Sequence, residues 1–78
     1  MNEELILKKT IRIIKENFPG MEIVNEDTNF KEDLEMDSLD FVETVMKIED
    51  GFEIKIEDKE GEKLKTVKDL VTLIKSKL

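Results

Sequence analysis

Residues 37–50, which read DSLDFVETVMKIED, decide the fold. Their apolar residues recur every three or four positions and cover about half of a helical wheel, and the opposite arc is mostly acidic. Asp37 suits the N-cap, because a carboxylate there accepts hydrogen bonds from free first-turn amides, and Asp40 follows three residues later. Gly51 is expected to end the helix. We therefore predict an amphipathic helix from Ser38 to Asp50.

Helical patterns flank this stretch on both sides. Residues 3–17 form a predicted helix, capped by Asn2 and stopped by Pro19-Gly20, with an apolar face made of Leu7, Ile11, Ile14 and Phe18 and widened by Ile6 and Ile13. Thr66 caps a last helix that continues to Leu78, and Asp69 completes an approximate capping box. Residues 58–63 allow one or two helical turns, weakened by Gly61.

These elements predict an all-α fold: a small four-helix bundle with three main helices, one short helix and a long first loop, forming a single domain over residues 1–78. The loop, residues 19–36, has apolar positions that pin it to the core, at Met21, Ile23, Val24, Phe30 and Leu34. Residues 52–57 alternate between apolar and polar, which is typical of a strand. Pairing with residues 21–24 would give a helix-plus-hairpin α+β fold, which is the alternative.

Composition excludes several functions. The 78 residues include 20 acidic and 13 basic ones, for a net charge of −7, with no histidine and no cysteine. A histidine- or cysteine-based catalytic site and a standard zinc site are therefore excluded, and the acidic surface disfavours nucleic acids and anionic membranes. The acidic run at residues 33–37 fails as a calcium loop, because Ser38 and Thr44 stand where glycine and glutamate are needed. We expect no catalytic residue and no metal site.

The chain starts with an acidic segment and has no apolar run long enough to span a membrane. We therefore expect a cytoplasmic protein, and we expect it to be a monomer.

Ser38 is the candidate for chemistry. It follows the N-cap, so its hydroxyl is expected to be exposed near the positive end of a helix, a favourable position for a phosphate ester. The residues alone also allow an ordinary first-turn serine, and both interpretations stay open at this point.

The string Asp37-Ser38-Leu39, preceded by Leu34 and followed by an acidic amphipathic helix, resembles the attachment motif of the acyl carrier protein family, in its bacterial fatty-acid type. The similarity continues through Glu49-Asp50 and Phe52 to Thr66-Val67. It implies that Ser38 bears a 4′-phosphopantetheine arm, transferred from coenzyme A by a phosphopantetheinyl transferase. Acyl chains would then ride as thioesters on the arm's thiol. The chain would be a non-catalytic carrier between the enzymes of fatty acid biosynthesis.

The resemblance also implies two sets of binding residues. Basic docking patches on fatty acid synthase enzymes would meet Asp37, Leu39, Asp40, Glu43, Met46, Glu49 and Asp50. An acyl pocket would be formed by Phe30, Val42, Met46, Ile48, Ile56, Leu64 and Leu70. The residues alone would equally assign Leu39, Met46 and the pocket residues to the core.

The sequence departs from the family pattern at several positions. Glu35 replaces the usual glycine three residues before the serine, Glu57 replaces a common proline, and Lys47 stands among the acids, four residues after Glu43, where it can pair with it. With Gly61 weakening the short helix, we expect a more mobile lid over the pocket. These departures leave open a specialised carrier for a polyketide, lipid or other secondary pathway. An unmodified acidic adaptor that binds a basic protein is the alternative from a different class.

Overall fold

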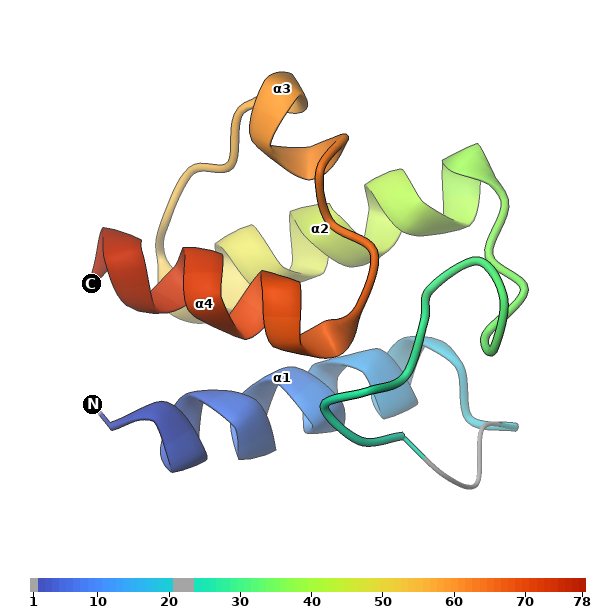
Figure 1. Ribbon diagram of the computed structural model, residues 1–78, viewed down its shortest axis with the longest axis horizontal. Coiled ribbons are helices and arrows are strands. Elements are labelled where there is room, and N and C mark those ends of the chain that lie inside the picture. Colours follow the sequence, from blue (N-terminus) through green and yellow to red (C-terminus); the bar gives the residue numbers. More distant parts are fainter. Residues whose placement is uncertain (1, 21–23) are drawn as a thin grey trace.

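The computed structural model describes residues 2–20 and 24–78, within which there are four helices: α1 (Glu3–Asn17), α2 (Ser38–Phe52), α3 (Asp58–Gly61) and α4 (Val67–Lys77). α1 packs against α2 and α4 and runs antiparallel to both, whereas α3 lies on the opposite side of α2 and α4 from α1 (Figure 1). The predicted all-α bundle is confirmed. None of the described helices is long and apolar enough to cross a membrane.

The α+β alternative is wrong for the part that the structure describes. Phe52 is the last residue of α2, and residues 54–57 form the irregular connection to α3. The proposed partner segment falls largely outside the described residues, as do the predicted apolar anchors Met21 and Ile23. The alternation at residues 52–57 therefore reflects burial and not a strand. Phe52, at the end of α2, and Ile56, in the connection, are buried, and Ile54 is half-buried.

Three predicted N-caps are confirmed. The Asn2 side chain accepts from the amide of Leu5 at 2.9 Å, the Asp37 side chain from that of Asp40 at 2.8 Å, and the Thr66 side chain from that of Asp69 at 3.3 Å. Asp69 also accepts from the amide of Thr66 at 3.1 Å, which completes the predicted capping box. Each cap satisfies amides that the first turn of a helix leaves without an intrahelical partner.

The prediction that Gly51 ends the second helix is wrong. α2 continues through Gly51 to Phe52, and the chain leaves the helix at Glu53, whose φ of 55° lies in the left-handed region. Gly51 instead permits close packing, because a Cβ atom there would lie 2.7 Å from Cδ1 of Ile13 on α1. The glycine thus marks a helix–helix contact, and the left-handed cap falls on a glutamate two residues later.

The core is aliphatic and includes one polar residue that the pattern did not predict. On α1 the fully buried positions are Ile6, Thr10 and Ile14, while Leu7, Ile11, Ile13 and Phe18 are half-buried around them. The Thr10 hydroxyl is buried without a hydrogen-bond partner among the described residues. All the predicted apolar residues are therefore at least half-buried. The most deeply buried line, however, runs through Ile6, Thr10 and Ile14, and the prediction did not include Thr10.

The long first loop is fastened to the start of α4 by backbone hydrogen bonds. The amides of Val67 and Lys68 donate to the carbonyls of Thr28 and Glu26, and the amide of Phe30 donates to that of Lys65, at distances of 2.9–3.0 Å. Val24, Phe30 and Leu34 are buried, as predicted for anchors of this loop. The fastened loop delivers the chain to the N-terminus of α2, where Ser38 stands.

Candidate functional site

Ser38 is the first residue of α2 and is exposed. Its hydroxyl makes no hydrogen bond to any described residue, whereas the hydroxyl of the other serine, Ser76, donates to the carbonyl of Leu73 at 2.6 Å. The Asp37 carboxylate accepts from the Asp40 amide, so the cap is formed by the neighbouring residue and leaves the serine hydroxyl unengaged. Ser38 therefore offers an accessible oxygen at a rigid helix start.

Ser38 also stands on the rim of a groove with a volume of about 630 Å³. One wall is the face of α2 that carries Phe41, Val42 and Val45, and the other is formed by α3 and its flanks, with Ile56 and Leu64. Phe30 from the first loop packs edge-on against Phe41, with ring centroids 5.4 Å apart. Apolar side chains from both walls and Ser38 line the same groove, so a chain attached at the serine could lie in it.

Five of the seven predicted pocket residues line this groove: Phe30, Val42, Met46, Ile56 and Leu64. The other two, Ile48 and Leu70, do not line it, because their side chains point into the core, where each is at most 1% exposed. Sequence reasoning missed Met36, Phe41 and Val45. Phe41 and Val45 were on the apolar face of the helical wheel, but the wheel cannot separate residues that line an opening from residues that fill the core beneath it. Met36 lies in the loop before α2, where no periodic pattern marks it.

The side of the groove formed by α3 is fastened at two places. The Glu49 carboxylate accepts from the amide of Ile56 at 2.8 Å, which ties the α2–α3 connection to α2. Glu60 forms an ion pair with Lys77 at 2.9 Å and accepts from the amide of Glu57 at 3.0 Å. The Glu57 amide and then the Lys77 amine hold the pKa of Glu60 below its ordinary value.

Two of the positions at which the sequence departs from the family pattern, Glu57 and Gly61, lie on this side of the groove. A proline at position 57 has no amide hydrogen, so the bond from Glu57 to Glu60 exists only because the family's common proline is absent here. Gly61 stands opposite Phe41, where an added Cβ would lie 3.9 Å from that ring. α3 is short, but these contacts hold it beside the groove.

The predicted recognition residues divide between the solvent and the interior. Asp37, Leu39, Glu43, Met46 and Asp50 are exposed, whereas Asp40 and Glu49 are half-buried and bonded to backbone amides. Leu39 is 66% exposed and Met46 56%, so neither is a core residue. Val42 is also exposed, and with these two it forms an apolar ridge between acidic side chains.

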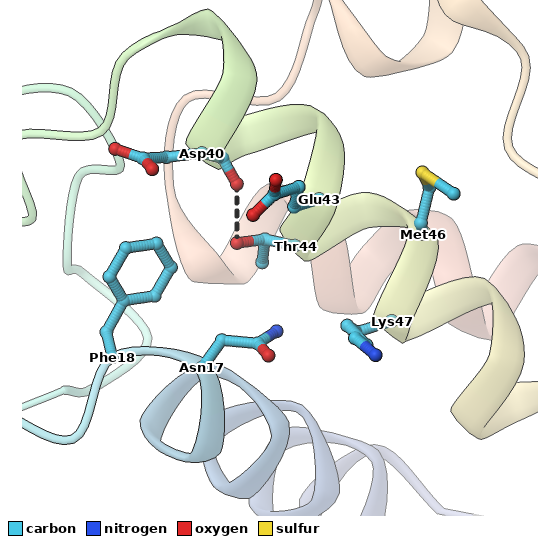
Figure 2. Close-up of a pocket in the computed structure, with 7 residues that line it drawn as sticks. All are labelled: Asn17, Phe18, Asp40, Glu43, Thr44, Met46 and Lys47. Atoms are coloured by element: carbon cyan, nitrogen blue, oxygen red, sulfur yellow. Dashed lines mark hydrogen bonds between the residues drawn. The ribbon is translucent and has the colours of Figure 1, made fainter.

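A smaller hollow of about 200 Å³ lies on the other flank of α2, between that helix and the end of α1 (Figure 2). Asn17 and Phe18 face Asp40, Glu43, Thr44 and Lys47 across it, and the Thr44 hydroxyl donates to the carbonyl of Asp40 at 2.9 Å. Lys47 and Glu43 share this hollow, but the predicted ion pair between them is absent among the described residues. Nor do the described residues contain a cluster of three metal-ligating side chains.

Comparison with known proteins points to one family. Residues 9–74 match the family model described as the phosphopantetheine attachment site. Proteins named acyl carrier protein are 46% identical in Lactobacillus acidophilus, over 97% of this chain and 96% of the relative, and 42% identical in Thermosynechococcus vestitus, over 100% and 98%. The crystal structure of an acyl carrier protein from Thermotoga maritima has a TM-score of 0.81 and 37% identity, covering 99% of this chain and 91% of that one.

Proposed function

Because this chain belongs to the acyl carrier protein family, whose members are non-catalytic carriers with a phosphopantetheine attachment site, we propose that Ser38 is the residue that bears the arm. The observation that carries the proposal is the hydroxyl itself, which is exposed, free of hydrogen bonds to the described residues, and on the rim of an apolar groove. Ser76 is also exposed, but its hydroxyl is engaged within α4 and it does not line the groove.

The attachment forms one bond and breaks one. The Ser38 oxygen bonds to the phosphorus that bears the pantetheine in coenzyme A, the pyrophosphate link to the nucleotide breaks, and the hydroxyl proton leaves to the transferase. The thiol at the end of the arm supplies the sulfur for thioesters, which a chain without cysteine lacks. The residues of this chain hold the serine at a rigid helix start and provide the groove beside it.

The proposed role is in fatty acid biosynthesis, in the cytoplasm, with partner enzymes that present basic patches. The support is the exposed acidic surface of α2 beside the apolar ridge, since charge complementarity speeds encounter and a few apolar contacts add affinity. A groove of about 630 Å³ suits an unbranched acyl chain, because aliphatic and aromatic side chains form much of its lining beside the charged ones. A specialised carrier would use the same surfaces, so the attached acyl group decides between them.

The test is the mass of the intact protein. Incubation with coenzyme A and a broad-specificity phosphopantetheinyl transferase should add the mass of one arm to the wild type and to Ser76→Ala, and none to Ser38→Ala. No gain with several transferases, or a gain that survives in Ser38→Ala, would overturn the proposal. Protein isolated from its source should carry saturated, 3-keto or 3-hydroxy straight chains if the pathway is fatty acid synthesis. Other acyl groups would favour the specialised carrier.

A further inference from the structure

We propose that Lys31 binds the phosphate of the group attached at Ser38; this inference rests on the proposed attachment at Ser38. Lys31 is not one of the residues predicted from the sequence, and nothing in the attachment motif requires a lysine at this position. Its role follows from where the first loop puts it.

Lys31 is the single basic residue among the described residues that line the groove. The acidic ones are five: Asp37, Glu49, Glu57, Asp58 and Glu62. Lys31 is exposed and takes part in no ion pair with a described residue, although acidic side chains outnumber basic ones throughout this part of the chain. Its ammonium group is therefore available to a new anion.

The backbone around Lys31 is held in place relative to Ser38. The Asn29 side-chain oxygen accepts from the amides of Lys31 and Glu32, both at 2.9 Å, which fixes the turn in which the lysine stands. The amide of Met36 donates to the carbonyl of Phe30 at 3.0 Å. Since Phe30 precedes Lys31 and Met36 lies two residues before Ser38, this bond ties the lysine's turn to the segment that enters α2.

The charges around Ser38 favour a cation at this point. A phosphodiester on Ser38 would carry a negative charge directly after the Asp37 carboxylate and two residues before that of Asp40. The N-terminus of α2 offsets part of this repulsion, but the Asp37 carboxylate already caps that helix end. An ammonium group, with three donors and a compact charge, is a common partner of phosphate and needs no fixed geometry. Lys31 is the residue of the groove with that chemistry.

The first test compares the reactivity of lysine amines before and after the arm is attached. Both forms are treated briefly with an acetylating reagent, and the extent of acetylation at each lysine is read by peptide mass spectrometry. An ion pair at an exposed site should slow acetylation of Lys31 by about two- to fivefold in the arm-loaded form. Lys68, which is exposed on α4 and outside the groove, is the internal control and should not change.

The second test observes the phosphate directly and excludes simple shielding of Lys31 by the arm. In the arm-loaded protein, Lys31→Gln should shift the ³¹P resonance of the phosphodiester and abolish its dependence on salt, Lys31→Arg should restore both, and Lys68→Gln should alter neither. An arm-loaded protein in which Lys31 acetylates at its original rate, or in which Lys31→Gln leaves the ³¹P resonance unmoved, would overturn this inference and leave Ser38 as the attachment site. Absence of any mass gain would overturn both.

Discussion

Glu35 is, with Glu53 at the end of α2, one of two described non-glycine residues whose backbone adopts a positive φ. Its φ of 52° lies in the left-handed region, three residues before Ser38, where the related family usually has glycine. A side chain in this region costs free energy because its Cβ crowds the backbone, and glycine is free of that cost. The loop therefore keeps the conformation that glycine favours, and the glutamate adopts it under strain.

Glu35→Gly should raise the free energy of unfolding by about 0.5–1 kcal/mol, since relief of the left-handed strain exceeds the extra entropy of glycine in the unfolded chain. Urea unfolding followed by circular dichroism measures it. The control is Glu32→Gly, which removes the same charge from the same loop, at a position where φ is not positive. That variant should be destabilised. Equal changes in the free energy of unfolding for the two substitutions would show that the backbone at Glu35 is not strained.

At the scale of the elements, the helix starts could be predicted and the end of α2 could not. Caps at Asn2, Asp37 and Thr66 depend on a side chain and an amide three residues apart, so the information is local. Gly51 was misassigned as the stop of α2 because its role is a contact with Ile13 of another helix, which no local pattern contains. For the same reason the burial of Thr10 and the division of the apolar residues of α2 between core and groove were not predictable.

The candidate site shows the same division. The position of Ser38 at the start of α2 follows from its capping neighbour, and the structure agrees with the predicted exposure of its hydroxyl. The placement of Glu49 does not follow from the sequence, because its carboxylate bonds to Ile56, seven residues away in a different element. Lys31 enters the groove only through the turn formed by the first loop.

α3 should lose stability in mild acid through Glu60. The folded-state pKa of Glu60 is held below its ordinary value of 4.5 by the Glu57 amide and the Lys77 amine. A carboxylate with a lowered pKa contributes stability that is fully present above pH 4.5 and is lost as the pH falls through the folded-state pKa. The stability difference between wild type and Glu60→Gln should therefore be constant near neutral pH and shrink below pH 4.5.

The measurement is urea unfolding of wild type and Glu60→Gln from neutral pH to about pH 3. Lys77→Met removes the partner amine and should weaken the same pH dependence. Glu62→Gln removes a neighbouring charge that forms no ion pair with a described residue, and it controls for net charge. A stability difference for Glu60→Gln that stays constant down to about pH 3 would show that neither contact favours the ionised form.

At the scale of the whole molecule, the charge is unevenly distributed. Residues 20–62 contain 16 acidic and 4 basic residues, whereas residues 63–78 contain 1 and 5. Of the acidic residues described in the middle segment, Glu60 alone forms an ion pair, and the other ion pairs involve acids of α1. The surface that presents Ser38 therefore consists largely of unpaired like charges, which repel one another in the folded state.

This repulsion should make the melting temperature rise with sodium chloride. The screening length falls from about 30 Å at 0.01 M salt to about 3 Å at 1 M, so exposed carboxylates cease to repel, and about 1 kcal/mol of relief would raise the melting temperature of a domain this small by about 4–8 °C. Chloride is preferred to sulfate, which stabilises proteins generally by exclusion from their surfaces.

The double variant Glu32→Gln/Glu53→Gln should melt higher than wild type at low salt and respond less to added salt. Glu4→Gln/Glu16→Gln removes the same charge but loses ion pairs to Lys8 and Arg12, so it should not gain stability. Equal responses of the two double variants would mean that the net charge, and not its concentration in residues 20–62, sets the salt dependence.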